Sequence, residues 1–198
     1  MKSINEEIEV KKDNNKKLFK VRPDELKDLH KLFTKELKEI YWIEGAQKKV
    51  LHKMHKYACG LLLVDEISRQ LDVVKDHRLR IEEIFSTMDE DSDTSKSATM
   101  EGLIDGAEFL MSEFRKGVIR DAGIILAAYK MKHFMIASYG SLCFYARILG
   151  NGNATSLLNA SIDEEKLANE KLSRLIESIR LESVNESAVD SRMEKIEN

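Results

Sequence analysis

Two glutamates stand at positions where the apolar pattern of the sequence would have leucine. In residues 155–179 the apolar side chains recur at alternating steps of three and four, and Glu165 falls on this seam. Glu44 falls on a similar seam nearer the start of the chain, between Ile40 and Leu51. A carboxylate on a packing face is costly unless a metal, a cation or hydrogen bonds compensate it. The pair therefore predicts a buried carboxylate site.

Three further residues could take part in the chemistry of this site. His77 lies on or beside the seam of a second helical segment, where a histidine is more often a hydrogen-bonded core residue than a ligand. Lys132 and His133 interrupt a segment that is otherwise apolar on nearly all sides. Together with the two glutamates, the two histidines offer donors that are adequate for one iron, manganese or zinc ion.

The segments that must position these residues all have helical periodicity, and no sustained strand-like alternation is found. Pro23 and Asp24 open the first predicted helix, which runs to Gly60. The other predicted helices span about 61–88, 100–117, 118–149 and 154–181. The sequence therefore predicts an all-α protein with one bundle domain at 23–181, and flexible polar tails at 1–22 and 182–198.

The arrangement of these segments predicts a particular bundle. Four long helices, with an acidic linker and a short helix between the second and the third, fit a four-helix bundle with one long crossover that contains a short extra helix. This is the ferritin-like arrangement. In such bundles a dinuclear metal centre takes carboxylates from all four helices and histidines from two of them.

Composition excludes several other classes. The formal net charge is −3 and no long basic face is present, so a nucleic-acid partner is not expected. Cys59 and Cys143 form no CxxC pair, which argues against a metal knuckle or a disulfide framework. Lys130 and Lys132 interrupt the most apolar helix, so no membrane span is expected. The polar N-terminus does not resemble a signal peptide, and the expected location is the cytoplasm.

The chain resembles the YciE/YciF-type family of ferritin-like proteins. The matching stretches are EIYWIEGAQKKVLHKM (39–54), HRLRIEEIF (77–85), MEGLIDGAEF (100–109), VIRDAGIILAAYKMKHFMIASYGSL (118–142) and SIDEEKLANEKL (161–172). They cover about residues 26–181 in the correct order. The resemblance implies a ferritin-like bundle that is often dimeric, is linked to bacterial stress responses and holds a di-iron or di-manganese type site.

Compared with this family, several carboxylates are missing. The candidate ligands that are kept are Glu44, His77, His133 and Glu165. The family positions that have changed are Val73, Lys132 and Met135, each in place of a glutamate, and Asn169 in place of an aspartate. Because valine and methionine do not substitute for hard oxygen ligands, the remaining set is not expected to hold two divalent ions.

Three functional interpretations follow. The first is a stress-associated ferritin-like protein, not an enzyme, with a degenerate di-metal site and no cofactor; in it, the Lys132 ammonium lies between Glu44 and Glu165. The alternative is a single Fe, Mn or Zn ion held by Glu44, His77, His133 and Glu165, with no ammonium among them. A third is a scaffold that binds a partner through exposed aromatics, for which Tyr41, Trp42 and Phe144 are candidates. A homodimer is expected from the resemblance.

Overall fold

The computed structural model describes residues 21–193 of the 198-residue chain. The predicted tail at 1–22 lies almost wholly outside these residues. Of the predicted tail at 182–198, only the helical backbone up to Met193 is described, and it continues the last helix beyond the predicted end at residue 181.

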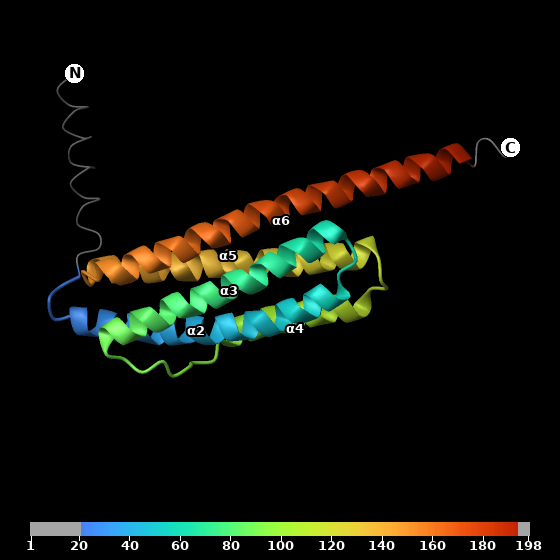
Figure 1. Cartoon of the computed structure of the whole chain (residues 1–198). Helices are drawn as coiled ribbons and strands as arrows, with labels where there is room; N and C mark the ends of the chain where they lie inside the picture. The colour runs from blue at the N-terminus through green and yellow to red at the C-terminus, as the bar shows by residue number, and fades with distance from the viewer. Residues whose placement is uncertain (1–20, 194–198) are drawn as a thin grey trace, which may run out of the picture.

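The described residues form helices and no strand, so the all-α prediction is confirmed (Figure 1). The helices are α2 (Leu26–Tyr57), α3 (Leu61–Met88), α4 (Ala98–Glu113), α5 (Val118–Ile148) and α6 (Gly152–Met193). The ranges predicted for α3 and α5 agree with the structure to within one residue.

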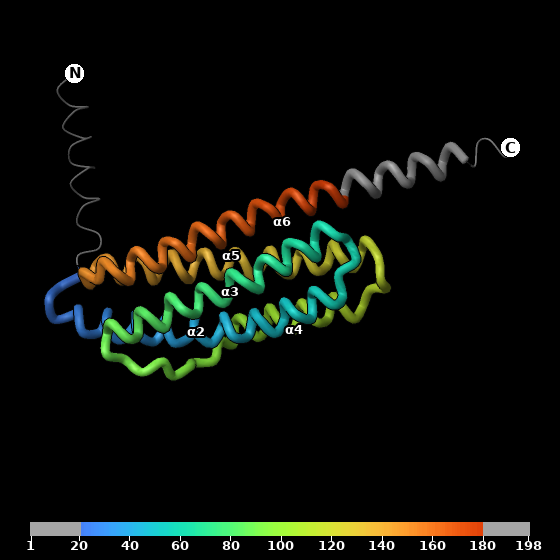
Figure 2. Tube along the Cα trace, in the orientation of Figure 1, coloured from blue at the N-terminus to red at the C-terminus, as the bar shows by residue number. Residues whose placement is uncertain are grey.

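The four long helices form a ring. α2 packs against α3 and α5 packs against α6, while α3 also contacts α6 and α2 also contacts α5. Residues 89–97 and α4 return along the length of the bundle, so that α3 and α5 run in the same direction and every neighbouring pair in the ring is antiparallel (Figures 1 and 2). α4 packs on α5 and α2. This is the ferritin-like bundle with a long crossover that the sequence predicts.

The turn between α2 and α3 differs from the prediction in one detail. α2 ends at Tyr57, and Gly60 is the residue before α3, with φ of −69° and not a left-handed conformation. The Asp121 carboxylate accepts hydrogen bonds from the backbone N–H groups of Cys59 (2.9 Å) and Gly60 (2.7 Å). A Cβ atom at Gly60 would lie 3.2 Å from this carboxylate. The glycine therefore serves the close approach of α5 to the turn.

Burial follows the predicted seams. α5 is apolar on nearly all sides but leaves one exposed stripe, which runs through Leu126, Lys130, His133, Ala137, Ser141 and Phe144. Two of its buried side chains, Asp121 and Lys132, are charged. Of the three aromatics suggested as a partner surface, Tyr41 and Trp42 pack against the core, whereas Phe144 is 52% exposed. Within the described residues, no helix has both the length and the apolar character that a membrane crossing requires.

Candidate metal centre

Three of the four predicted ligands meet in the middle of the bundle. Glu44 comes from α2, His77 from α3 and Glu165 from α6, and all three side chains are fully buried. One donor atom of each lies within 4.8 Å of the others. The two seam carboxylates therefore do face a common point, together with an imidazole.

His77 is held by carboxylates at both ring nitrogens. Its Nδ1 lies 3.0 Å from Glu44 Oε1, and its Nε2 lies 2.9 Å from Glu164 Oε2. Only a doubly protonated imidazole can donate to both. Burial lowers the pKa of His77, but the hydrogen bond and charge of Glu44, with the charge of Glu165, outweigh it and raise the pKa above 6.5. In this arrangement His77 is a cation.

Lys132 supplies the second cation. Its Nζ lies 2.9 Å from Glu165 Oε1, and its side chain is only 3% exposed. Burial raises the pKa of Glu165 above its usual value, and the charge of Lys132 opposes this rise. The prediction from the sequence was that the Lys132 ammonium lies between Glu44 and Glu165. Its ion pair in the described residues is with Glu165 alone, and Glu44 is compensated by other groups.

Tyr139 is the second group that compensates Glu44. Its hydroxyl donates a 2.6 Å hydrogen bond to Glu44 Oε1, and its ring lies edge-on to the His77 ring, with centroids 5.4 Å apart. Burial, followed by the Glu44 charge, raises the pKa of Tyr139 well above 10, so the hydroxyl keeps its proton. Sequence analysis missed this residue, although it lies two helical turns after Lys132 and so on the same face.

Glu164 and Arg80 complete the cluster. The Arg80 guanidinium binds both oxygens of Glu164, at 2.6 and 2.7 Å, in a bidentate ion pair. The hydrogen bond from Arg80 is the main cause that lowers the pKa of Glu164 below its usual value. Sequence analysis missed both residues, because charged residues at these positions look like an ordinary solvated helix face.

The charges of this cluster cancel. Its three carboxylates are those of Glu44, Glu164 and Glu165, and its three cations are those of His77, Arg80 and Lys132. A buried set of charges is tolerated when it is paired and hydrogen-bonded in this way. The cluster therefore has its neutralising charge in protein groups, without any ion.

The register of the helices can be compared with that of a ferritin-like di-metal centre. Such centres use one Glu from each of two helices and a Glu-x-x-His pair from each of the other two. In this chain the buried residues at the six positions are Glu44 (α2), Val74 and His77 (α3), Lys132 (α5), and Glu165 and Ala168 (α6). Three of these six positions thus carry a possible ligand, and the other three carry residues that cannot act as hard oxygen or imidazole ligands.

On α3 the residue buried on the same face as His77 is Val74, and not Val73, the position at which the resemblance implies a replaced glutamate. Val74 is fully buried, whereas Val73 is only half-buried. A ligand on the same face as His77 lies three residues before it, and that residue is Val74. On α6 the residue three positions after Glu165 is Ala168, which is buried.

His133 does not join the cluster, which corrects the predicted ligand set. Its side chain is exposed and lies edge-on to Tyr129, with centroids 4.5 Å apart. Successive residues of an α-helix point about 100° apart, so an inward Lys132 directs His133 outward. Of the two other replaced family positions, Met135 is a core residue, and Asn169 is half-buried with its Oδ1 atom unpaired among the described residues.

A two-metal centre does not fit this donor set. Such a centre uses six donors, whereas this site offers three donors and a buried ammonium. A single ion fits better in two respects. Glu44 Oε2 and Glu165 Oε2 are buried without a hydrogen-bond partner among the described residues. The contact between His77 Nε2 and Glu164 also resembles the way in which carboxylates orient a metal-binding histidine. Binding would require that His77 Nδ1 lose its proton.

Comparisons with known proteins identify the fold and the family of this chain. YciF of Escherichia coli (strain K12) is 42% identical over 80 residues, which are 40% of this chain and 48% of that protein, so the alignment spans about half of the relative's length. Two solved structures share the fold at higher coverage. The E. coli stress protein YciF has a TM-score of 0.74 and 29% identity, over 76% of this chain and 96% of that chain. YcfI from Rhodopseudomonas palustris has a TM-score of 0.72 and 28% identity, over 73% of this chain and 92% of that chain.

A structure from Xanthomonas campestris, 15% identical with a TM-score of 0.62 over 81% of this chain and 99% of that one, shows the fold alone. The family model named "Domain of unknown function (DUF892)" matches residues 28–188. This chain therefore belongs to the DUF892 family, as a protein of the YciE/YciF type.

Proposed function

We propose that this chain is a stress-associated protein of the YciF type in which the ancestral di-metal centre has become a metal-free ion-pair cluster that no longer supports redox chemistry. The observation that carries the proposal is the ion pair of Lys132 with Glu165, at 2.9 Å, in a position where a ferritin-like centre has a carboxylate. The link to stress rests on the name of the related E. coli protein alone.

The charges of the cluster support the proposal that neither metal ion of a di-metal centre is bound. Two divalent cations need several carboxylates for neutralisation, and here the carboxylates are already balanced by protein cations. A divalent ion next to Glu165 would also lie close to the Lys132 ammonium, in surroundings that screen the repulsion poorly. The cluster then has a structural role, because it joins α2, α3, α5 and α6 through directional contacts that fix how the helices face one another.

One alternative is supported by a specific observation. The unpaired Oε2 atoms of Glu44 and Glu165, together with His77, could hold one Fe, Mn or Zn ion, with Glu164 orienting the imidazole. This arrangement differs from the sequence-based alternative because His133 is absent from it. It requires an ion that competes with the protonation of His77, so binding would strengthen as pH rises.

Thermal unfolding in the presence of metal ions distinguishes the metal-free cluster from the single-ion site. Protein stripped with a chelator is unfolded with excess Fe(II) without oxygen, and with Mn(II) or Zn(II). An ion that binds only the native state, at a hundred times its Kd, adds about 2.7 kcal/mol and raises the Tm. The proposal predicts no rise in Tm. It also predicts that Fe(II) added in air consumes oxygen no faster with the protein than in the same buffer without it. A saturable rise that is lost in His77→Gln would overturn it in favour of the single-ion alternative.

Two other expectations remain proposals. Homodimer formation is supported by large apolar side chains exposed near the end of the bundle where α2 meets α3, with Leu61 80% and Leu62 66% exposed. Sedimentation equilibrium tests it, and a monomer at micromolar concentration would contradict it. Cytoplasmic location is tested by fractionation of cells that express the full-length protein.

A further inference from the structure

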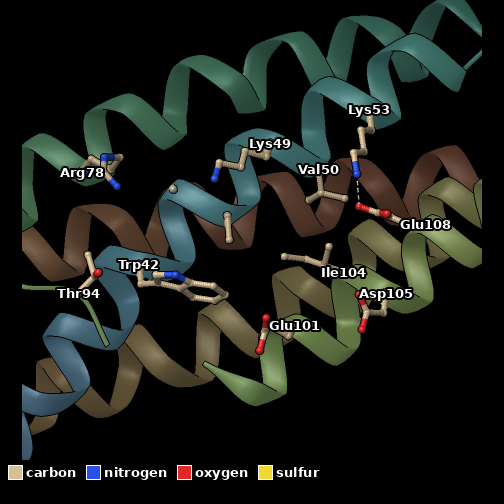
Figure 3. Close-up of a pocket in the computed structure, with 12 residues that line it drawn as sticks. Trp42, Lys49, Val50, Lys53, Arg78, Thr94, Glu101, Ile104, Asp105 and Glu108 are labelled. Atoms are coloured by element: carbon tan, nitrogen blue, oxygen red, sulfur yellow. Dashed lines mark hydrogen bonds and ion pairs between the residues drawn. The ribbon is translucent and has the colours of Figure 1, made fainter. Parts of the chain in front are cut away.

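A pocket separate from the ion-pair cluster lies between α2, α3 and α4 (Figure 3). Its volume is about 390 Å³, which is within the range of pockets that bind small molecules. The residue of the crossover linker that reaches it is Thr94. The proposed function makes no use of this pocket.

The base of the pocket is apolar and includes a flat ring. Trp42 and Val50 of α2 and Ile104 of α4 line it, and the Trp42 indole lies between the two walls in Figure 3. Gly45 lies beside them in the middle of α2, where glycine costs about 0.5–1 kcal/mol relative to alanine. A Cβ atom there would lie 3.0 Å from Arg78 Nη1, so the glycine allows Arg78 to reach the pocket.

The two walls carry opposite charges. The cationic residues Lys49, Lys53 and Arg78 come from α2 and α3, and the acidic residues Glu101, Asp105 and Glu108 come from α4 (Figure 3). Lys53 and Glu108 form an ion pair across the pocket. Among the described residues, Lys49 and Asp105 make no ion pair with another side chain. One cation and one anion are thus available on opposite walls.

Arg78 is fixed before any ligand arrives. Its guanidinium lies over the Tyr41 ring, 4.0 Å from the centroid, and donates a 3.1 Å hydrogen bond to the Tyr41 carbonyl oxygen. Glu82 lies 3.8 Å away, and the Arg78 side chain remains 29% exposed. A cation that is already ordered loses little conformational entropy when it binds an anionic group.

We propose that this pocket binds a small zwitterion with a flat apolar body. The anionic group would pair with Lys49 and Arg78, the ammonium would pair with Asp105, and the apolar body would lie on the Trp42 indole. Glu101 already forms an ion pair with Lys96. Opposite walls explain why one molecule must carry both charges. A simple anion or a simple cation would gain from one wall and would be repelled by the other.

The test uses the fluorescence of Trp42, which is the only tryptophan of the chain. Phenylalanine is the zwitterionic probe, and its two matched analogues are 2-phenylethylamine, which lacks the carboxylate, and 3-phenylpropanoate, which lacks the ammonium. The proposal predicts a saturable change with phenylalanine at millimolar concentrations. Each analogue should bind about tenfold or more weakly, the factor that corresponds to about 1.4 kcal/mol.

Substitutions at two exposed residues test which wall binds which charge of the ligand. Lys49→Met should weaken phenylalanine binding and leave the weak 2-phenylethylamine response unchanged. Asp105→Asn should weaken both. The matched controls are Lys48→Met, at an exposed neighbour on α2, and Glu113→Gln, at an exposed site on α4; neither residue lines the pocket. Circular dichroism checks that all four variants keep the helical fold.

Three results would overturn the proposal. They are the absence of a saturable response to phenylalanine, equal binding of phenylalanine and either analogue, and loss of binding in a control variant to the same extent as in Lys49→Met or Asp105→Asn. Because none of these residues belongs to the ion-pair cluster, the outcome is independent of whether the cluster binds metal.

Discussion

The Lys132 ammonium lies 2.9 Å from Glu165 Oε1 in the centre of the bundle, and both side chains are almost fully buried. Both residues occupy positions that would provide glutamate ligands in a ferritin-like di-metal centre. A salt bridge therefore stands where a metal–carboxylate bond would be.

Lys132→Met should destabilise the protein, because it leaves the Glu165 carboxylate buried without its cation. Removal of one partner from a buried ion pair costs about 3–5 kcal/mol. The free energy of unfolding in urea measures this loss. Adding Glu165→Leu to the same variant should restore most of the stability, since a buried ion pair can be replaced by apolar residues at little cost.

Lys130→Met is the control for this experiment. Lys130 lies two residues away on α5 and is exposed, so its loss should change the free energy of unfolding by less than about 0.5 kcal/mol. If the two single substitutions had equal effects, the buried ion pair with Glu165 would contribute no more to stability than an exposed lysine does.

Tyr139→Phe should destabilise the protein by about 1.5–3 kcal/mol, because Glu44 loses a hydrogen bond to a charged acceptor in the core. Tyr145→Phe is the matched control, on the same helix and half-buried, with no hydroxyl hydrogen bond found in the described residues. Chemical denaturation compares the two. A Tyr139→Phe protein as stable as the wild type would mean that Glu44 does not depend on this donor.

Stability should fall as pH rises above neutrality. The pKa of His77 is raised above 6.5 in the folded state, so its stabilising contribution is fully present below 6.5 and is lost as pH rises through the folded pKa. The raised pKa of Glu165 acts in the same direction from pH 4.5 upward. Urea unfolding between about pH 6 and pH 9 measures this slope.

His77→Gln should remove the part of this slope that begins at 6.5, whereas His52→Gln, at an exposed site on α2, should leave it intact. NMR titration of the His77 ring gives an independent value. A ring pKa below 6.5 would contradict the doubly protonated imidazole.

Sequence periodicity alone was sufficient to find Glu44 and Glu165, because α2 and the described part of α6 each have one apolar seam on which a carboxylate is conspicuous. α5 has no such seam, since it is apolar on nearly all sides, and periodicity could not decide whether Lys132 or His133 faces inward. The partner helices decide it, and Lys132 is the inward residue.

Other members of the cluster could not be found from the sequence. Glu164 and Arg80 are half-exposed, and only their approach to His77 across α3 and α6 gives them a role. Glu-x-x-His spacing, counted from His77 and from Glu165, would have pointed to Val74 and Ala168 as further inward positions. The pocket beside Trp42 depends on where α4 packs against α2, which follows from the path of the crossover and not from any local pattern.

Restoration of the missing donors should restore metal binding. The variant combines Val74→Glu, Lys132→Glu and Ala168→His, which returns one Glu on each of two helices and Glu-x-x-His on the other two. Lys132→Glu alone is the control, because it removes the ammonium and leaves the set two donors short.

The most direct measurement is elemental analysis of the wild type and this triple variant, both purified from cells grown with iron and manganese and both dialysed in the same buffer. The wild type is expected to hold far less than one ion per chain, whereas the triple variant is expected to hold one or more. Near-stoichiometric iron or manganese in the wild type would contradict the replacement of the metal centre by Lys132 and His77.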